Sequence, residues 1–231
     1  MKTAVVIGAG FGGLASALRL AARGVHTTVV DRLSMPGGRA VEFSREHSNQ
    51  TFRYDAGPTV LTAPILFEEL FQLFGERLED HVELMPVTPW YQMKFIDGST
   101  FNYGGSTEEI QAEIAKFSAN DALAYPAFLA HSKKLFDKGY EELGTQAFLG
   151  WGSMIKAMPA MMRLRADRSV YALTAKYFKH ESIRRAFSIQ PLLVGGNPFD
   201  TTSIYSLIHY LERKWGVWFV RGGMAQLVAA M

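Results

Sequence analysis

Glycines near the start of the chain have the spacing of a phosphate-binding loop. Gly8, Gly10 and Gly13 spell G-x-G-x-x-G, and Gly12 is assigned to the same loop. In such a loop the first glycine permits a tight turn, the second lets the backbone approach a pyrophosphate, and the third lets a helix pack closely on a strand. The pyrophosphate would meet free N–H groups at the positive end of that helix. The alternative is a glycine-rich turn that binds no ligand.

An acidic residue follows where a dinucleotide-binding unit needs one. Asp31 directly follows the β-branched run 27–30, and its carboxylate would accept hydrogen bonds from ribose hydroxyls. An acid at this position disfavours NADP, whose additional phosphate is usually bound by an arginine. Arg32 is adjacent and is kept as a candidate ligand, so this exclusion is weak. FAD and NAD remain the candidate cofactors.

A second glycine pair lies shortly after this acid. Gly37 and Gly38 precede Arg39, whose planar set of donors would bring a further cation to the diphosphate or the flavin. An ordinary surface turn with a solvated arginine fits the local sequence equally well.

The elements that would position these residues form a strand–helix–strand unit. Residues 4–7 are apolar and predict a buried strand, and residues 11–23 predict a helix that Gly24 ends. Residues 27–30 predict a second strand, parallel to the first. These segments together make a βαβ unit.

The rest of the chain is predicted to hold antiparallel strands and then a long helical stretch. Hairpins are expected at 39–54 and 93–103, and helices at 65–74, 107–140, 151–187 (interrupted at Pro159) and 203–214. The predicted fold class is α/β: a Rossmann-type βαβ domain interrupted by a mixed α+β, largely helical substrate domain. The expected divisions are 1–60, 61–214 and 215–231, the last returning to the first domain.

The overall composition excludes several classes of protein. The 231 residues carry 24 basic and 22 acidic side chains, a balance that argues against a nucleic-acid-binding protein. There is no cysteine, so disulfides, thiolate metal sites and cysteine nucleophiles are excluded, and no metal site is predicted. No uncharged stretch reaches the roughly 18 residues of a membrane-spanning helix. The expected location is the cytoplasm, with attachment to a membrane surface left open.

A methionine-rich segment and four titratable residues are weaker candidates. A basic amphipathic segment at 151–168 could lie on an anionic bilayer or form a wall for a long hydrocarbon, although its spacing favours an ordinary core-facing helix. Its characteristic residues are Met154, Lys156, Met158, Met161, Met162, Arg163, Arg165 and Arg168. Possible proton acceptors are Asp137, Glu141, His180 and His209, but each fits a structural role better, so no catalytic residue is assigned.

Several motifs together resemble a known superfamily. The glycine loop, Asp31, Gly37 to Arg39 and the run Asp55-Ala56-Gly57-Pro58-Thr59 are similar to FAD-dependent amine oxidases and carotenoid desaturases. Later motifs resemble bacterial-type phytoene desaturases more narrowly. These motifs are 83–89, Gly139-Tyr140, Leu143-Gly144, 192–199, 203–205, 207–209 and 215–219.

The resemblance implies a flavoprotein that removes hydrogens from the polyene phytoene. It places the glycine loop, Asp31 and Arg39 at the ADP half of FAD, and Gly57, Pro58 and Thr59 near the flavin ring. The family more often has glutamate at the position of Asp31. Phytoene resides in membrane lipid, so the resemblance also implies a protein attached peripherally to a membrane.

The end of the chain departs from the family pattern. Family members continue well beyond Arg221-Gly222-Gly223, with a helix, a further strand and a second glycine-rich FAD segment. We therefore expect residues 1–231 to be an incomplete enzyme that folds poorly alone. Three hypotheses remain: the N-terminal part of a phytoene desaturase, another FAD oxidoreductase such as an amine oxidase, and an inactive fragment that holds no FAD.

Overall fold

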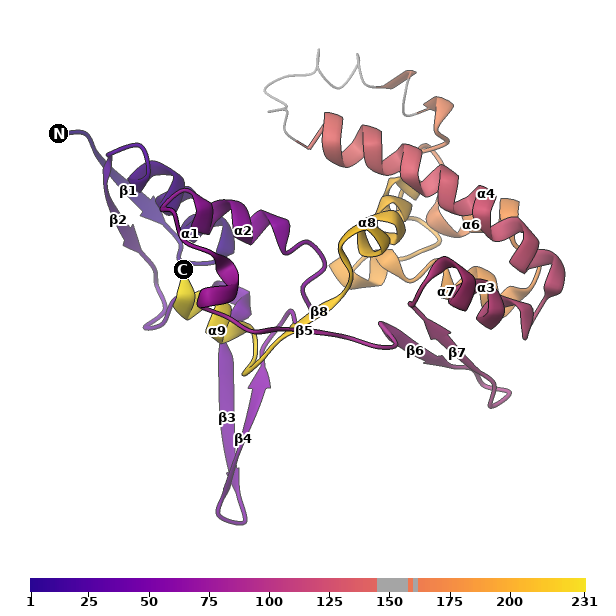
Figure 1. The fold of residues 1–231 in the computed structure, drawn as a ribbon, viewed down its shortest axis with the longest axis horizontal. Helices are drawn as coiled ribbons and strands as arrows, with labels where there is room; N and C mark the ends of the chain where they lie inside the picture. Colours follow the sequence, from indigo (N-terminus) through magenta and orange to yellow (C-terminus); the bar gives the residue numbers. More distant parts are fainter. Residues whose placement is uncertain (145–157, 160–161) are drawn as a thin grey trace. The chain divides into compact units, whose positions relative to one another are not determined.

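Contacts within the chain separate it into two units (Figure 1). The computed structural model describes residues 1–144, 158–159 and 162–231. Unit 1 comprises Met1–Val87 and Trp215–Met231, and unit 2 comprises Thr88–Lys214. The boundary therefore lies later than the expected residue 60. The reason is that Leu61, Leu78 and Val82 share one buried cluster with the C-terminal residues Val220 and Leu227.

Unit 1 begins with the predicted strand–helix–strand segment. Strand β1 (Thr3–Ile7) and strand β2 (His26–Val30) pair in parallel, and helix α1 (Phe11–Ala21) connects them. Gly24 lies just after α1 with a positive φ of 75°, which glycine adopts without strain.

Strand β1 is less buried than its sequence predicted. Ala4 and Val6 are half-buried, whereas Val5 is 67% exposed and Ile7 is 87% exposed. Successive side chains of a strand point to opposite faces. One face of the pair is therefore turned toward α1, and within the described residues the other face presents apolar side chains to solvent.

Two antiparallel strand pairs complete unit 1. Strands β3 (Glu42–His47) and β4 (Gln50–Asp55) form the predicted antiparallel hairpin after a 3-10 turn, Gly38–Ala40. Strand β5 (Leu84–Pro86) pairs antiparallel with β8 (Trp218–Val220), so two distant segments meet in one sheet. The helical elements are α2 (Ile65–Gln72), η2 (Leu78–Asp80) and α9 (Met224–Ala230).

Unit 2 combines one hairpin with a set of helices. Strands β6 (Tyr91–Lys94) and β7 (Thr100–Tyr103) form the hairpin expected at 93–103, with its turn at Asp97–Gly98. The helices are α3 (Thr107–Ala115), α4 (Ala119–Phe136), η3 (Asp137–Glu142), α6 (Val170–Tyr177), α7 (Glu181–Ala186), η4 (Gln190–Val194), η5 (Ser203–Ser206) and α8 (Leu207–Trp215).

The helical stretch predicted at 107–140 is divided into separate helices. Ser106 and Glu109 form a capping box at the start of α3, with the Ser106 N–H donating to the Glu109 carboxylate at 2.6 Å. Ser118 then caps α4 by accepting a hydrogen bond from the Asp121 N–H at 3.2 Å. A serine cap competes with continuation of the preceding helix, which explains the division.

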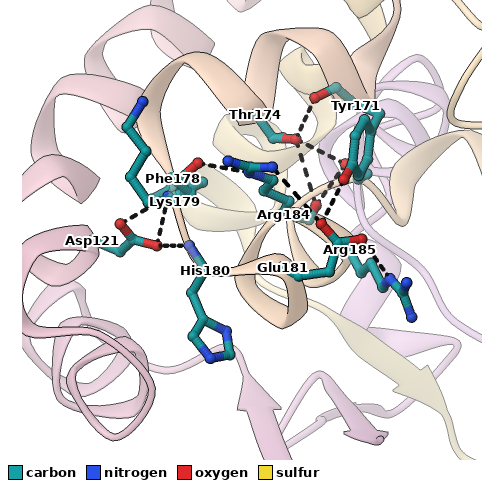
Figure 2. A network of polar contacts seen from close by, with 10 residues as sticks. Asp121, Tyr171, Thr174, Phe178, Lys179, His180, Glu181, Arg184 and Arg185 are labelled. Atoms are coloured by element: carbon teal, nitrogen blue, oxygen red, sulfur yellow. Dashed lines mark hydrogen bonds and ion pairs between the residues drawn. The ribbon is translucent and has the colours of Figure 1, made fainter.

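A buried carboxylate holds α4 to the junction of α6 and α7 (Figure 2). Asp121 is only 1% exposed, and its oxygens accept hydrogen bonds from the Lys179 N–H at 2.9 Å and the His180 N–H at 2.8 Å. On the other side of the junction, the Arg184 guanidinium donates to the Phe178 carbonyl at 2.9 Å. The backbone groups between the two helices are thus paired by side chains.

Replacing Asp121 by alanine should lower the free energy of unfolding by about 2–4 kcal/mol, because it leaves buried N–H groups without an acceptor. Asp137→Ala is the matched control, since Asp137 forms an exposed pair with Lys133 and should change stability by less than about 1 kcal/mol. Urea unfolding of the two variants measures both values. Equal losses would contradict the assigned role of Asp121.

Candidate functional site

The glycine loop joins the end of β1 to the start of α1. Gly8 has a φ of 106°, a backbone conformation that favours glycine, and its N–H donates to the Val30 carbonyl at 2.7 Å. A Cβ on Gly13 would lie 1.8 Å from the Gly8 oxygen and 3.5 Å from Val6. Gly13 therefore allows α1 to approach the strand closely, as its place in the motif predicts.

Gly10 differs from Gly13 because, within the described residues, neither a close contact nor its backbone conformation explains the absence of a side chain. Its φ of −76° suits any residue, and a Cβ there would be 3.9 Å from the nearest atoms, in Gly37 and Gly38. A Cβ on Gly12 would meet nothing within 4 Å. Open space beside both glycines is what close approach of a ligand to the backbone requires.

The N-terminus of α1 is suited to an anion. Gly10 is the N-cap of this 11-residue helix, no side chain caps it, and its first turn carries no acidic residue. The first N–H groups of a helix have no partner within the helix, and the helix dipole is positive there. A pyrophosphate would satisfy both, so these residues fit a dinucleotide.

Asp31 has a structural role that was not predicted from the sequence. One of its oxygens accepts a hydrogen bond from the Ala9 N–H at 2.6 Å, and the other accepts from the Leu33 N–H at 2.8 Å. The hydrogen bond from Ala9, followed by that from Leu33, lowers the pKa of the Asp31 carboxyl below its ordinary value. The ionised carboxylate has further lone pairs. It can therefore fix the loop and still accept a ribose hydroxyl.

The second glycine pair lies directly against the loop. The Gly37 N–H donates to the Ala9 carbonyl at 2.7 Å, and Gly37 forms an isolated bridge with Gly10. A Cβ on Gly38 would be 3.2 Å from the Cα of Gly10. These contacts favour the interpretation of Gly37 and Gly38 as part of one site over that of an independent surface turn.

The Asp55–Thr59 motif adjoins the same turn through Gly57. A Cβ on Gly57 would be 2.4 Å from the carbonyl oxygen of Arg39, so this position requires glycine. The Arg39 side chain is exposed and forms no ion pair within the described part of the chain. Pro58 and Thr59 are exposed, as is Arg32 beside Asp31.

Asp55 connects this group to the C-terminal segment. Its carboxylate accepts a hydrogen bond from the Met224 N–H at 2.9 Å, at the start of α9. A Cβ on Gly223 would lie 2.9 Å from the same Asp55 oxygen. In the sequence Asp55 stood out only as part of a motif, and its contact partner is 169 residues away. Pattern analysis could not find this pair.

Two of the possible proton acceptors, the half-buried Asp137 and the exposed Glu141, have their charges paired. Asp137 pairs with Lys133 at 2.7 Å and Glu141 with Lys214 at 2.7 Å. His180 is half-buried, and its backbone N–H donates to Asp121. These contacts agree with the structural roles that the sequence favoured.

His209 belongs to a buried polar network in unit 2. The imidazole is fully buried and contacts the hydroxyl groups of Tyr103 and of Tyr125, the latter at 3.0 Å. Burial lowers its pKa well below the ordinary value. Glu212, which the sequence did not single out, is also fully buried and accepts a hydrogen bond from Tyr91 at 2.8 Å. Burial raises the pKa of the Glu212 carboxyl to about 7.

The expectations about metal sites, membrane-spanning helices and the methionine-rich segment can be compared with the structure only for the described residues. Across 1–144, 158–159 and 162–231 no group of three metal-ligating side chains occurs. Within the same ranges no helix is long and apolar enough to cross a membrane. Half of the methionine-rich segment, including Met154, Lys156 and Met161, lies outside the described residues. Met158 and Met162 are described and exposed.

The chain belongs to the family of flavin containing amine oxidoreductases, whose family model matches residues 11–231. Among its relatives, a lycopene-forming phytoene desaturase of Pantoea ananas is 48% identical over 231 residues, which are 100% of this chain and 46% of that protein. A neurosporene-forming phytoene desaturase of Cereibacter sphaeroides is 42% identical over 99% of this chain and 43% of that protein. The chain thus spans about half the length of the curated relatives that it matches.

Solved structures share the fold at low sequence identity. A Pyrococcus furiosus protein superposes with a TM-score of 0.59 at 17% identity, covering 99% of this chain and 47% of that one. Putrescine oxidase bound to putrescine gives a TM-score of 0.56 at 14% identity, covering 99% and 48%. These likenesses concern the fold alone.

Proposed function

We propose that this chain provides the FAD-binding part, and a portion of the substrate-binding part, of an enzyme that desaturates phytoene to conjugated carotenoids. The observation that carries the proposal is the 48% identity to a phytoene desaturase over the whole chain. The matched residues span both units and extend well beyond the glycine loop that many dinucleotide-binding proteins share.

Residues of unit 1 would bind and orient the cofactor. The N-terminus of α1 and the backbone of Gly10 and Gly12 would meet the pyrophosphate, and Asp31 would accept a ribose hydroxyl. The Arg39 guanidinium would add a cation at the phosphates, with Arg32 close by, and Gly57 to Thr59 would adjoin the flavin ring. FAD, once bound, supplies the hydride acceptor that desaturation of an unactivated chain needs.

An apolar substrate also favours a protein that acts at a membrane surface. A polyene has little polar surface, so it partitions into lipid rather than water. We infer that the protein is cytoplasmic and collects its substrate at a membrane surface, to which it attaches peripherally. The substrate would be the polyene alone, with no nucleic-acid partner, in keeping with the net charge of +2.

The fold likeness to putrescine oxidase keeps an amine substrate as the second candidate. Recognition of a cationic amine needs an acidic group facing the ligand. In the described part of unit 2, the buried Glu212 already accepts a hydrogen bond from Tyr91, and Glu181 is paired with Arg185 at 2.9 Å. These pairings favour the apolar substrate.

Flavin binding can be tested on a joined chain. Residues 1–231 would be continued by the part of the Pantoea ananas phytoene desaturase that follows its match. We expect the purified joined chain to show a flavin absorption spectrum and about one FAD per chain. A colourless, folded joined chain would support the hypothesis of a fragment that holds no FAD.

Arg39→Ala should weaken FAD binding more than Arg45→Ala in this joined chain. Arg39 lies at the turn that contacts the glycine loop, whereas Arg45 lies on the hairpin strand β3, over the ring of Phe43 at 5.4 Å. A lost contact between a guanidinium and a phosphate costs about 1.5–3 kcal/mol, or roughly tenfold or more in affinity. Titration of apoprotein with FAD measures both constants, and equal values would remove Arg39 from the site.

A further inference from the structure

Unit 2 contains an apolar groove of about 530 Å³ that is separate from the glycine loop. Its walls come from the strand β6, the helices α6 and α7, and the segment that follows α7. The lining residues are Met93, Phe95, Tyr171, Arg185, Ala186, Ser188, Ile189, Leu192, Pro198 and Phe199. A volume of this size is typical of pockets that bind small molecules.

The polar side chains in the lining already have partners in the protein (Figure 2). The Tyr171 hydroxyl donates to Glu181 at 2.7 Å, and Arg185 pairs with the other Glu181 oxygen at 2.9 Å. The Ser188 hydroxyl donates to the Arg184 carbonyl at 2.6 Å. The groove therefore offers a ligand mainly apolar surface, and its one cation is neutralised by an adjacent carboxylate.

The rim of the groove presents large apolar side chains to solvent. Leu192 is 59% exposed and Phe199 is 58% exposed, and the adjoining Leu193 and Val194 are also exposed. Exposed apolar patches of this kind usually mark a binding surface. Phe199 is held in place by Tyr171, whose ring centroid is 4.6 Å away.

The backbone that carries this rim is fixed at several points. The Tyr171 N–H donates to the Pro198 carbonyl at 3.1 Å, and the Gly196 N–H donates to the Pro191 carbonyl at 2.8 Å. At the start of the segment, the buried Gln190 side chain donates to the Tyr103 hydroxyl at 3.0 Å. Exposure of the apolar side chains is thus part of an ordered arrangement, and a bound ligand would need little reorganisation of the loop.

We propose that this groove binds a segment of a neutral, elongated polyene, with Leu192 and Phe199 at its entrance. The inference rests on the proposed function and adds a location for the substrate. A charged or amine ligand would leave its own charge without a partner in this lining, at a considerable desolvation cost. A neutral hydrocarbon needs no such partner and gains from burial.

Diphenylhexatriene, a neutral rod-shaped triene that fluoresces in apolar surroundings, tests the groove on the joined chain. We expect saturable binding that Leu192→Asp or Phe199→Ser weakens about tenfold or more, because each removes apolar contact at the entrance. Leu123→Asp is the matched control, since Leu123 is 78% exposed on α4 and does not line the groove. Equal affinities in the Leu192 and Leu123 variants would overturn the proposal.

Colour formation separates failure of the groove from failure of the proposed function. In cells that accumulate phytoene, the joined chain should form coloured polyenes, and its Leu192→Asp variant should keep FAD but lose most of the colour. If both form equal colour, the groove proposal is wrong and the desaturase proposal stands. If the unmodified joined chain holds FAD and forms no colour, the desaturase proposal is wrong, and the triene titration alone decides the groove.

Discussion

Replacing Gly10 by valine should abolish FAD binding while leaving unit 1 folded. The φ of −76° allows an L side chain, and the nearest protein atoms to a Cβ are 3.9 Å away, so the protein itself accommodates part of the new side chain. The same side chain would occupy the space through which a pyrophosphate approaches the backbone. We expect the affinity of the joined chain for FAD to fall by about a hundredfold or more, which corresponds to roughly 3 kcal/mol.

Two other substitutions, Gly13→Val within α1 and Ala22→Val at its C-cap, make this result specific. Ala22→Val changes an exposed residue at the far end of the helix and should leave FAD binding unchanged. Gly13→Val would place a side chain against the Gly8 carbonyl, with its Cβ at 1.8 Å, and should destabilise the unit itself. For Gly13→Val, both the melting temperature and the FAD content should therefore fall. For Gly10→Val, the FAD content should fall while the melting temperature of the protein without FAD stays unchanged. A Gly10→Val chain that retains one FAD would exclude the loop from the site.

Glu212→Gln and His209→Gln should give the stability of unit 2 opposite pH dependences. The pKa of Glu212 is raised from 4.5 to about 7, so its contribution to stability is present below about pH 4.5 and is lost as pH rises through 7. The full loss is on the order of 3 kcal/mol. The pKa of His209 is lowered below 6.5, so its contribution is present above that pH and is lost as pH falls.

Between about pH 4.5 and 6.5 these two effects offset each other in the unmodified chain. The groups that face the pair are Tyr91, Tyr103 and Tyr125, together with Arg213. In Glu212→Gln only the lowered pKa of His209 remains, so the free energy of unfolding should rise with pH across this window. In His209→Gln only the raised pKa of Glu212 remains, so the free energy of unfolding should fall as pH rises. Urea unfolding at several pH values measures both slopes, and two slopes of the same sign would contradict the assignment.

Elements whose signals are local could be predicted from the sequence. The strand–helix–strand unit follows from an apolar run, a glycine loop and a β-branched run, all within residues 3–30. The capping box at Ser106 and the turn at Asp97–Gly98 are likewise contained in a few neighbouring residues. The sequence left the contact of Gly37 and Gly38 with the loop undecided, because a surface turn has the same local sequence.

Features that depend on distant residues were not predictable from the sequence. Glu212 is buried because Tyr91, 121 positions earlier, supplies a hydroxyl to its carboxylate. From the sequence alone Asp121 resembles a surface residue of α4. Only the tertiary structure shows that the N–H groups of Lys179 and His180 donate to it. The later unit boundary arises in the same way, from pairing of β5 with β8.

The most direct measurement compares the activity of the joined chain on two candidate substrates. Purified joined chain with bound FAD would be given phytoene in lipid vesicles and, separately, putrescine, with an electron acceptor present. We predict that the absorption bands of a longer conjugated polyene appear with phytoene, and that putrescine is unchanged. Oxidation of putrescine while phytoene remains unchanged would contradict the desaturase proposal and would assign the chain to an amine oxidase instead.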